Sequence, residues 1–166
     1  MKKPLRKKPG KPGKPKNIRN YVVWLLGRRE YSEHEIRQRL TQRECTSEEI
    51  DDALQFVKSY GYQSDERYAA MKARAESKRR GNRRIEYTLA SKGIAKEEIE
   101  DQLANLEPET DRAIAAVSRF EGQALEQKLK EKIWRFLSSR GFGSSAIKAA
   151  IEHLREILEE TTTGEA

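Results

Sequence analysis

The most concentrated chemical feature of this chain is a run of basic side chains near its middle. Arg74 and Lys78 lie four residues apart, so they share one face if this segment is a helix. Such a run suits DNA phosphates or an acidic groove of a protein, and it equally suits a solvated helix face balanced by acids of a neighbour. Only Glu76 interrupts the basic side chains, which are the candidate contact residues Lys72, Arg74, Lys78, Arg79, Arg80, Arg83 and Arg84.

Residue patterns that would support catalysis or cofactor binding are missing from the sequence. There is no Gly-x-x-x-x-Gly-Lys-Ser/Thr and no Gly-x-Gly-x-x-Gly. The two histidines, His34 and His153, stand far apart, and neither is at metal-ligand spacing from the single cysteine, Cys45. With two histidines and one cysteine, the sequence offers few residues for a nucleophile–base arrangement such as Ser–His–Asp or Cys–His. We predict a protein that is not an enzyme and uses no cofactor or metal.

The charge of the chain is high and unevenly placed. Charged residues make up 37% and apolar residues 36% of the 166 residues, which suits a thin helical protein rather than one large core. The net charge is +7, but residues 1–19 hold nine basic side chains and no acid. Residues 20–166 therefore have a net charge of −2. A claim of DNA binding must depend on local patches and on the N-terminal arm.

The first sixteen residues have the composition of a solvated arm. Residues 1–16 contain four of the five prolines and are otherwise rich in Lys and Gly. We expect a disordered basic arm that acts either as a solubilising tail or as an electrostatic tether to phosphates. One cysteine excludes a disulfide within the chain, and the longest apolar run, Tyr21–Leu26, is too short to span a bilayer. We predict a cytoplasmic monomer with no membrane partner.

One spacing of apolar residues occurs three times and indicates the fold. Positions four, ten and four residues apart return after 49 residues and again after 48. Such a period marks tandem copies of one supersecondary unit, each of which needs its neighbours to bury its apolar face. The spacing predicts an all-α protein, with three tandem three-helix repeats forming an elongated, curved array. Its members are Ile36, Leu40, Ile50 and Leu54, then Ile85, Leu89, Ile99 and Leu103, then Ile133, Leu137, Ile147 and Ile151.

The predicted helices and domains follow this period. We expect a first repeat over 17–60, a second over 61–106, a third over 107–160 and a flexible tail over 161–166. The helices within the repeats are predicted at about 17–29, 32–43, 46–59, 64–80, 82–92, 96–106, 108–121, 125–140 and 143–159.

The residues between the helices support these boundaries. Ser32 with Glu35, and Thr46 with Glu49, have the spacing of capping boxes. Cys45 stands where later repeats have an apolar residue, so it is either a packed side chain or a reactive thiol. Glycines 93 and 141 suit helix stops.

Several segments match one family signature in order and spacing. They cover residues 61–69, 79–85 and 89–94, with further segments at 31–40 and 134–142. The pattern resembles the bacterial RecX regulatory proteins over about residues 18–158. Asn82 departs from the Pro that is common in that family, but Asn also suits a helix start. The signature positions, which can be structural or functional, are Asp65, Arg67, Tyr68, Arg79, Gly81, Arg84 and Ile85.

The resemblance implies a regulatory function. Members of the family are built from three three-helix repeats and bind the filament of the RecA recombinase on single-stranded DNA, lodging in its helical groove. They block filament growth or promote disassembly, and so reduce ATP hydrolysis, strand exchange and the SOS response. The resemblance implies no cofactor and no catalytic residues. Single-stranded DNA would be contacted directly or through the filament.

Two other functions stay open on the sequence alone. The first alternative is a stand-alone DNA-binding protein in which a three-helix unit acts like a helix-turn-helix. Against it, the predicted third helices 46–59 and 96–106 are rich in acids, whereas a helix in the major groove needs basic side chains. The second alternative is a protein-interaction scaffold that does not depend on nucleic acid.

Overall fold

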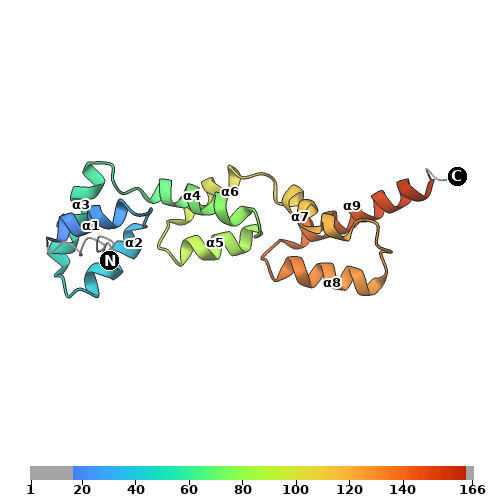
Figure 1. The fold of residues 1–166 in the computed structure, drawn as a ribbon, viewed down its shortest axis with the longest axis horizontal. Coiled ribbons are helices and arrows are strands. Elements are labelled where there is room, and N and C mark those ends of the chain that lie inside the picture. Colours follow the sequence, from blue (N-terminus) through green and yellow to red (C-terminus); the bar gives the residue numbers. More distant parts are fainter. Residues whose placement is uncertain (1–16, 164–166) are drawn as a thin grey trace, which may run out of the picture.

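The computed structural model describes residues 17–163, and every regular element in that range is a helix (Figure 1). The first repeat contains α1 (Ile18–Leu26), α2 (Glu33–Thr41) and α3 (Ser47–Ser59). The second contains α4 (Asp65–Ser77), α5 (Asn82–Ala90) and α6 (Lys96–Ala104). The third contains α7 (Glu109–Val117), a 3-10 turn (Ser118–Phe120), α8 (Gln127–Ser138) and α9 (Ser144–Thr163). The basic arm predicted for residues 1–16 lies outside the described residues.

The three bundles lie in one elongated row, as the repeated spacing predicted (Figure 1). Each bundle has its own core, and each core draws its residues from one stretch of the chain. Ten of the twelve repeated apolar positions are buried, and Leu103 and Ile151 are partly buried. The second core is the smallest because α4 contributes two alanines, Ala69 and Ala73, beside Tyr68.

Local side-chain chemistry starts and ends the helices as predicted. Ser32 and Thr46 form capping boxes with Glu35 and Glu49, which satisfy backbone N–H groups that a helix leaves free. Gly93 and Gly141 have positive φ angles of 75° and 82°. The equivalent turn of the first repeat holds a non-glycine residue, Glu44, at a φ of 62°.

Several helix ends differ from the prediction. The first helix ends at Leu26 rather than at residue 29, and α4 ends at Ser77 rather than at 80. α9 continues to Thr163, beyond the predicted end at 159, because neither Gly nor Pro occurs before Gly164 to stop it. Residues 164–166 of the predicted tail lie outside the described residues. Ala75 is exposed on α4, whereas Ala69 and Ala73 are buried.

Candidate functional site

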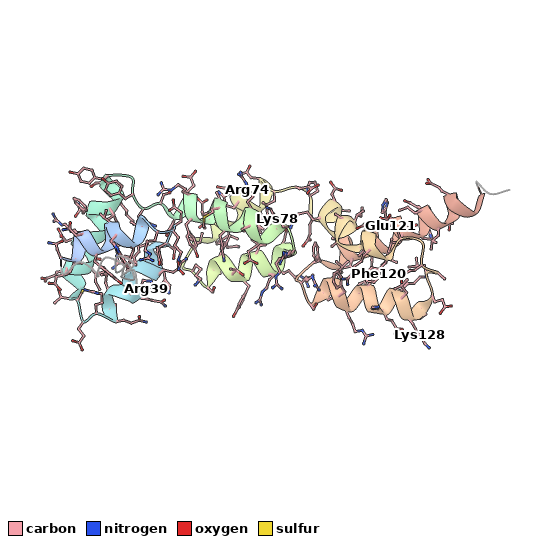
Figure 2. All side chains as sticks on the ribbon, viewed as in Figure 1. Arg39, Arg74, Lys78, Phe120, Glu121 and Lys128 are labelled. Carbon is pink, nitrogen blue, oxygen red and sulfur yellow. The ribbon has the colours of Figure 1, made fainter. Side chains whose placement is uncertain are left out.

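The structure distributes the seven candidate contact residues over two helices and the turn between them. Lys72 and Arg80 are engaged by one acid, since Glu76 lies 3.5 Å from the Lys72 Nζ and 3.9 Å from the Arg80 Nε. Arg74 and Lys78 are exposed on α4 and form no ion pair with any residue in the described range (Figure 2). Arg74 and Lys78 therefore remain available to a partner, whereas Lys72 and Arg80 are paired with Glu76, although all four belong to one run in the sequence.

The turn between α4 and α5 is a junction between the second and third repeats. The Gly81 N–H donates to the Arg140 carbonyl oxygen at 3.0 Å, and the Arg83 N–H donates to that of Gly141 at 3.2 Å. A Cβ atom on Gly81 would lie 2.3 Å from the Phe142 backbone, so only glycine permits this approach. The N-terminus of α5 thus abuts the turn that follows α8.

Two side chains of α7 close this junction. Arg112 donates to the Arg80 carbonyl oxygen at 2.9 Å and to the Asn82 side-chain oxygen. Glu109 accepts from the Asn82 N–H at 2.6 Å and from the Gly143 N–H at 3.3 Å. Burial lowers the pKa of Arg112, and the negative charge of Glu109 acts in the opposite direction.

Arg112 was not singled out from the sequence. It occupies the register position that holds Tyr21 in α1 and Tyr68 in α4, where all three residues are buried. The repeat alignment could have found it, because a charged residue at a core register position needs a polar partner nearby.

The junction brings a second group of cations beside Arg83 and Arg84. Because α5 begins where α8 ends, both helices lie along one long edge of the molecule (Figure 1). The exposed side of α8 contributes cations and one aromatic residue, and α5 contributes an exposed tyrosine. We call this surface the α5–α8 edge, and its residues are Arg83, Arg84, Tyr87, Lys128, Trp134 and Arg135.

The α5–α8 edge is positive because its cations are not neutralised. Within the described residues, none of Arg83, Arg84, Lys128 and Arg135 forms an ion pair. The guanidinium of Arg84 instead lies 5.5 Å from the ring centre of Tyr87, which is 64% exposed. Unpaired cations next to exposed aromatic rings can bind phosphates while the rings contact flat apolar groups. The α8 residues were missed because the sequence places them about fifty residues from the basic run.

The first repeat pairs several of its cations with acids, whereas Arg28, Arg39 and Arg43 lie over aromatic rings and have no ion pair within the described residues. Arg19 pairs with Asp52 at 2.6 Å, Arg37 with Asp51 at 2.7 Å, and Lys58 with Glu33. Two of the α3 acids that argue against binding in the major groove, Asp51 and Asp52, thus form ion pairs within the first repeat. The α5–α8 edge differs in that its unpaired cations come from two repeats that meet at one junction.

Comparison with known proteins places these features in one family. Residues 19–56 match a model described as RecX, first three-helix domain, and residues 64–103 match RecX, second three-helix domain. Regulatory protein RecX of Actinobacillus pleuropneumoniae serotype 5b (strain L20) is 41% identical over 127 residues, which cover 74% of this chain and 83% of the relative. The chain belongs to the RecX family.

Other RecX proteins extend the match. Regulatory protein RecX of Haemophilus ducreyi (strain 35000HP / ATCC 700724) is 39% identical over 145 residues, covering 85% of this chain and 94% of the relative. The crystal structure of RecX from Lactobacillus salivarius superposes with a TM-score of 0.75 at 19% identity, over 84% of this chain and 96% of that one. The latter likeness shows the shared helical fold, and the resemblance predicted from the signature segments is confirmed.

RecX proteins are a regulatory family, and nothing in the matches indicates catalysis. In the described part of the chain, no three His, Cys, Asp or Glu side chains are placed to share a metal ion. Among the same residues, no helix combines the length and apolarity that crossing a bilayer requires.

Proposed function

We propose that this chain binds the RecA filament on single-stranded DNA and restrains it, by blocking growth or promoting disassembly. Recombinase, ATPase and SOS co-protease activities would all fall, because each depends on the assembled filament. The protein would act in the cytoplasm as a monomer and without chemistry of its own. Membership of a family of regulatory proteins supports this proposal.

The observation that supports this proposal most directly is the α5–α8 edge. It joins unpaired cations of two repeats into one surface along a row of helices. A row of this length can contact neighbouring subunits of a polymer, and cations near the DNA would make the binding sensitive to salt. Of the seven residues predicted from the sequence, Arg83 and Arg84 belong to this edge, and we propose them, with the exposed Arg79 of the preceding turn, as filament or DNA contacts.

The experiment is RecA ATP hydrolysis on single-stranded DNA with the protein titrated in below one copy per recombinase subunit. We expect the rate to fall at substoichiometric amounts. A variant with Arg83, Arg84, Lys128 and Arg135 changed to Ala should need about tenfold more protein for the same inhibition. The matched control changes four ion-paired cations to Ala, namely Arg19, Arg37, Lys58 and Lys96. Equal loss in both variants would remove the α5–α8 edge from the mechanism.

The alternative is a stand-alone DNA-binding protein, which is favoured by Tyr87 and by Trp134, a residue 38% exposed on α8. Exposed rings among cations are typical of surfaces that stack the bases of a single strand. Tight binding to bare oligonucleotide, together with no effect on RecA up to saturation, would favour this alternative over filament regulation.

A further inference from the structure

The outer side of α4 carries a groove that the α5–α8 edge does not include. The groove has a volume of about 400 Å³ and is formed by α4 and its C-cap residue, Lys78. Its apolar part is Ala70, Met71 and Ala75, and Met71 is 45% exposed. Three cations complete its lining, namely Arg67, Arg74 and Lys78. In Figures 1 and 2, α4 with Arg74 and Lys78 lies along the upper edge, while α5 and α8 lie along the lower edge.

Two exposed tyrosines lie in a loop that is hydrogen-bonded to Arg67, at one end of this groove. The rings of Tyr60 and Tyr62 stack with centres 5.9 Å apart, and they are 64% and 48% exposed. Arg67 donates to the Tyr62 carbonyl oxygen at 2.8 Å and pairs with Glu30 at 2.6 Å. The loop that holds both rings is therefore fixed to a residue that lines the groove.

The composition of this surface matches that of protein-binding sites. Tyr, Met and Arg are enriched at protein interfaces, and a flexible Met side chain adapts to different apolar partners. Met71, which is 45% exposed beside the cations of the groove, therefore gives a partner an apolar contact as well as charge. Because Arg74 and Lys78 have no acid among the described residues, they are free to pair with carboxylates of a partner.

The spacing of the lining residues indicates the shape of that partner. Arg67, Met71, Arg74 and Lys78 follow each other at intervals of four, three and four residues, so they form one stripe along α4. A partner helix with Leu and Glu at the same intervals would place apolar side chains over Met71 and carboxylates beside the cations. We propose that the outer face of α4 is a docking site for an acidic amphipathic helix of a partner protein.

A nucleic acid fits this groove less well than it fits the α5–α8 edge. The side chains between the cations are alkyl rather than aromatic, and the rings of Tyr60 and Tyr62 lie at one end, so a row of bases could not stack along the groove. Arg67 is already neutralised by Glu30, which leaves only two free charges for phosphates. The proposal is independent of filament binding, because it uses another side of the molecule.

The test uses the full chain and a fluorescein-labelled peptide of about 15 residues with Leu and Glu at helical intervals, enough to cover α4. A scrambled peptide of the same composition and a dT oligonucleotide of similar length serve as controls. We expect anisotropy to show that the amphipathic peptide binds about tenfold more tightly than the scrambled one. Changing Arg74 and Lys78 to Glu should abolish this binding. Changing Lys128 and Arg135 to Glu, an equal change of charge on the other edge, should leave it unaltered.

Met71 offers a second readout. The chain has two methionines, so mass spectrometry can follow the peroxide oxidation of Met71 against that of Met1. The bound peptide should slow oxidation of Met71 alone. The proposal is overturned if the peptide does not bind, if the scrambled peptide binds equally well, or if both charge variants weaken binding equally. It is also overturned if the α4 variant loses oligonucleotide rather than peptide binding.

Discussion

The two junctions between repeats share one plan but are closed by different groups. In each junction, the first helix of the following repeat begins with an acidic residue. The carboxylate of this residue accepts a hydrogen bond from the first N–H of the middle helix in the preceding repeat. Asp65 accepts from Glu33 at 2.8 Å, and Glu109 accepts from Asn82 at 2.6 Å. The position is Ile18 in the first repeat, which has no described repeat before it. The shared plan is thus a helix N-terminus capped across the repeat boundary.

The first junction is completed by side chains. Glu35 closes the capping box of α2 and also pairs with Lys92 of the second repeat at 3.0 Å. Burial by itself would raise the pKa of Glu35, but the hydrogen bond and charge of Lys92 and the charge of Arg29 hold it below its ordinary value. Burial raises the pKa of Tyr68 to about 12, and the charge of Glu35 adds to this shift. Ionised side chains therefore determine how the first and second repeats meet.

The second junction adds direct backbone contacts to the side chains of Arg112 and Glu109. Gly81 replaces the Ser32 of the first repeat, and no capping box forms. The missing side chain lets the main chain of the third repeat approach and hydrogen-bond directly. The residue at the helix start thus decides whether the main chains of two neighbouring repeats can meet directly. We expect the first junction to respond to pH and salt, and the second to respond to changes of volume.

The largest effect should come from adding a methyl group at the second junction. Gly81→Ala places a Cβ against the Phe142 backbone, which cannot yield as a flexible side chain can. We expect a loss of about 3 kcal/mol in the free energy of unfolding, since overpacking against main chain is poorly relieved. Urea unfolding measures it, and Ser32→Ala is the matched control at the first junction, with an expected loss of about 1 kcal/mol. Equal losses would contradict the proposed difference between the junctions.

Removing the buried guanidinium should be the next most damaging change. Arg112→Met keeps the apolar stem but leaves the carbonyl oxygens of Glu107 and Arg80 without their donor. We expect a loss of about 2 kcal/mol, because buried acceptors that lose their partner are not resolvated. Thermal unfolding checks this. Arg112→Lys should restore only part of the loss, and full restoration would show that charge alone is needed.

The pH dependence of the free energy of unfolding should reveal the contribution of Glu35 at the first junction. Because the pKa of Glu35 is lower in the folded state, its contribution is complete above its unfolded pKa and is lost as pH falls through the folded value. Glu35→Gln should therefore cost about 1 kcal/mol at neutral pH and progressively less below about pH 4.5. Urea unfolding between pH 3 and pH 7 gives both curves. Parallel curves for the variant and the parent protein would show that Glu35 does not act through its charge.

The smallest predicted effect is a gain. Glu44→Gly should raise the free energy of unfolding by about 0.5 to 1 kcal/mol, because Glu44 has a φ of 62° that glycine adopts without strain. The reverse change in the later repeats, Gly141→Ala, should destabilise, since its Cβ would lie 2.6 Å from Arg84. Chemical denaturation of both variants measures this contrast. A loss at Glu44 would show that its side chain makes a contribution larger than the backbone strain.

Much of the fold could be predicted because it depends on local rules. The spacing of Ile36, Leu40, Ile50 and Leu54 specifies which side of each helix is buried, and the spacing recurs with each repeat. Ser32 and Thr46 act within three residues of themselves, so their capping boxes were predictable. Helix ends such as Ser77 were not, because the Arg79 and Arg80 N–H groups bond back to Glu76 in a turn that serves the next repeat.

The candidate site was less predictable, since charge in a sequence does not show which charges are neutralised. Arg74 and Arg80 look alike in the run, yet only Arg80 has an acid beside it. Lys128 and Arg135 stand far from the run, yet the fold places their helix against its end.

An all-helical RecX protein of tandem three-helix units could be recognised from residue patterns, because periodicity and capping are properties of neighbouring residues. What each unit packs against became clear from the three-dimensional arrangement of the repeats. The contact between Gly81 and Arg140 joins residues 59 positions apart, which no local pattern encodes. That contact aligns α5 with α8, and it thereby determines which cations remain free to meet a partner.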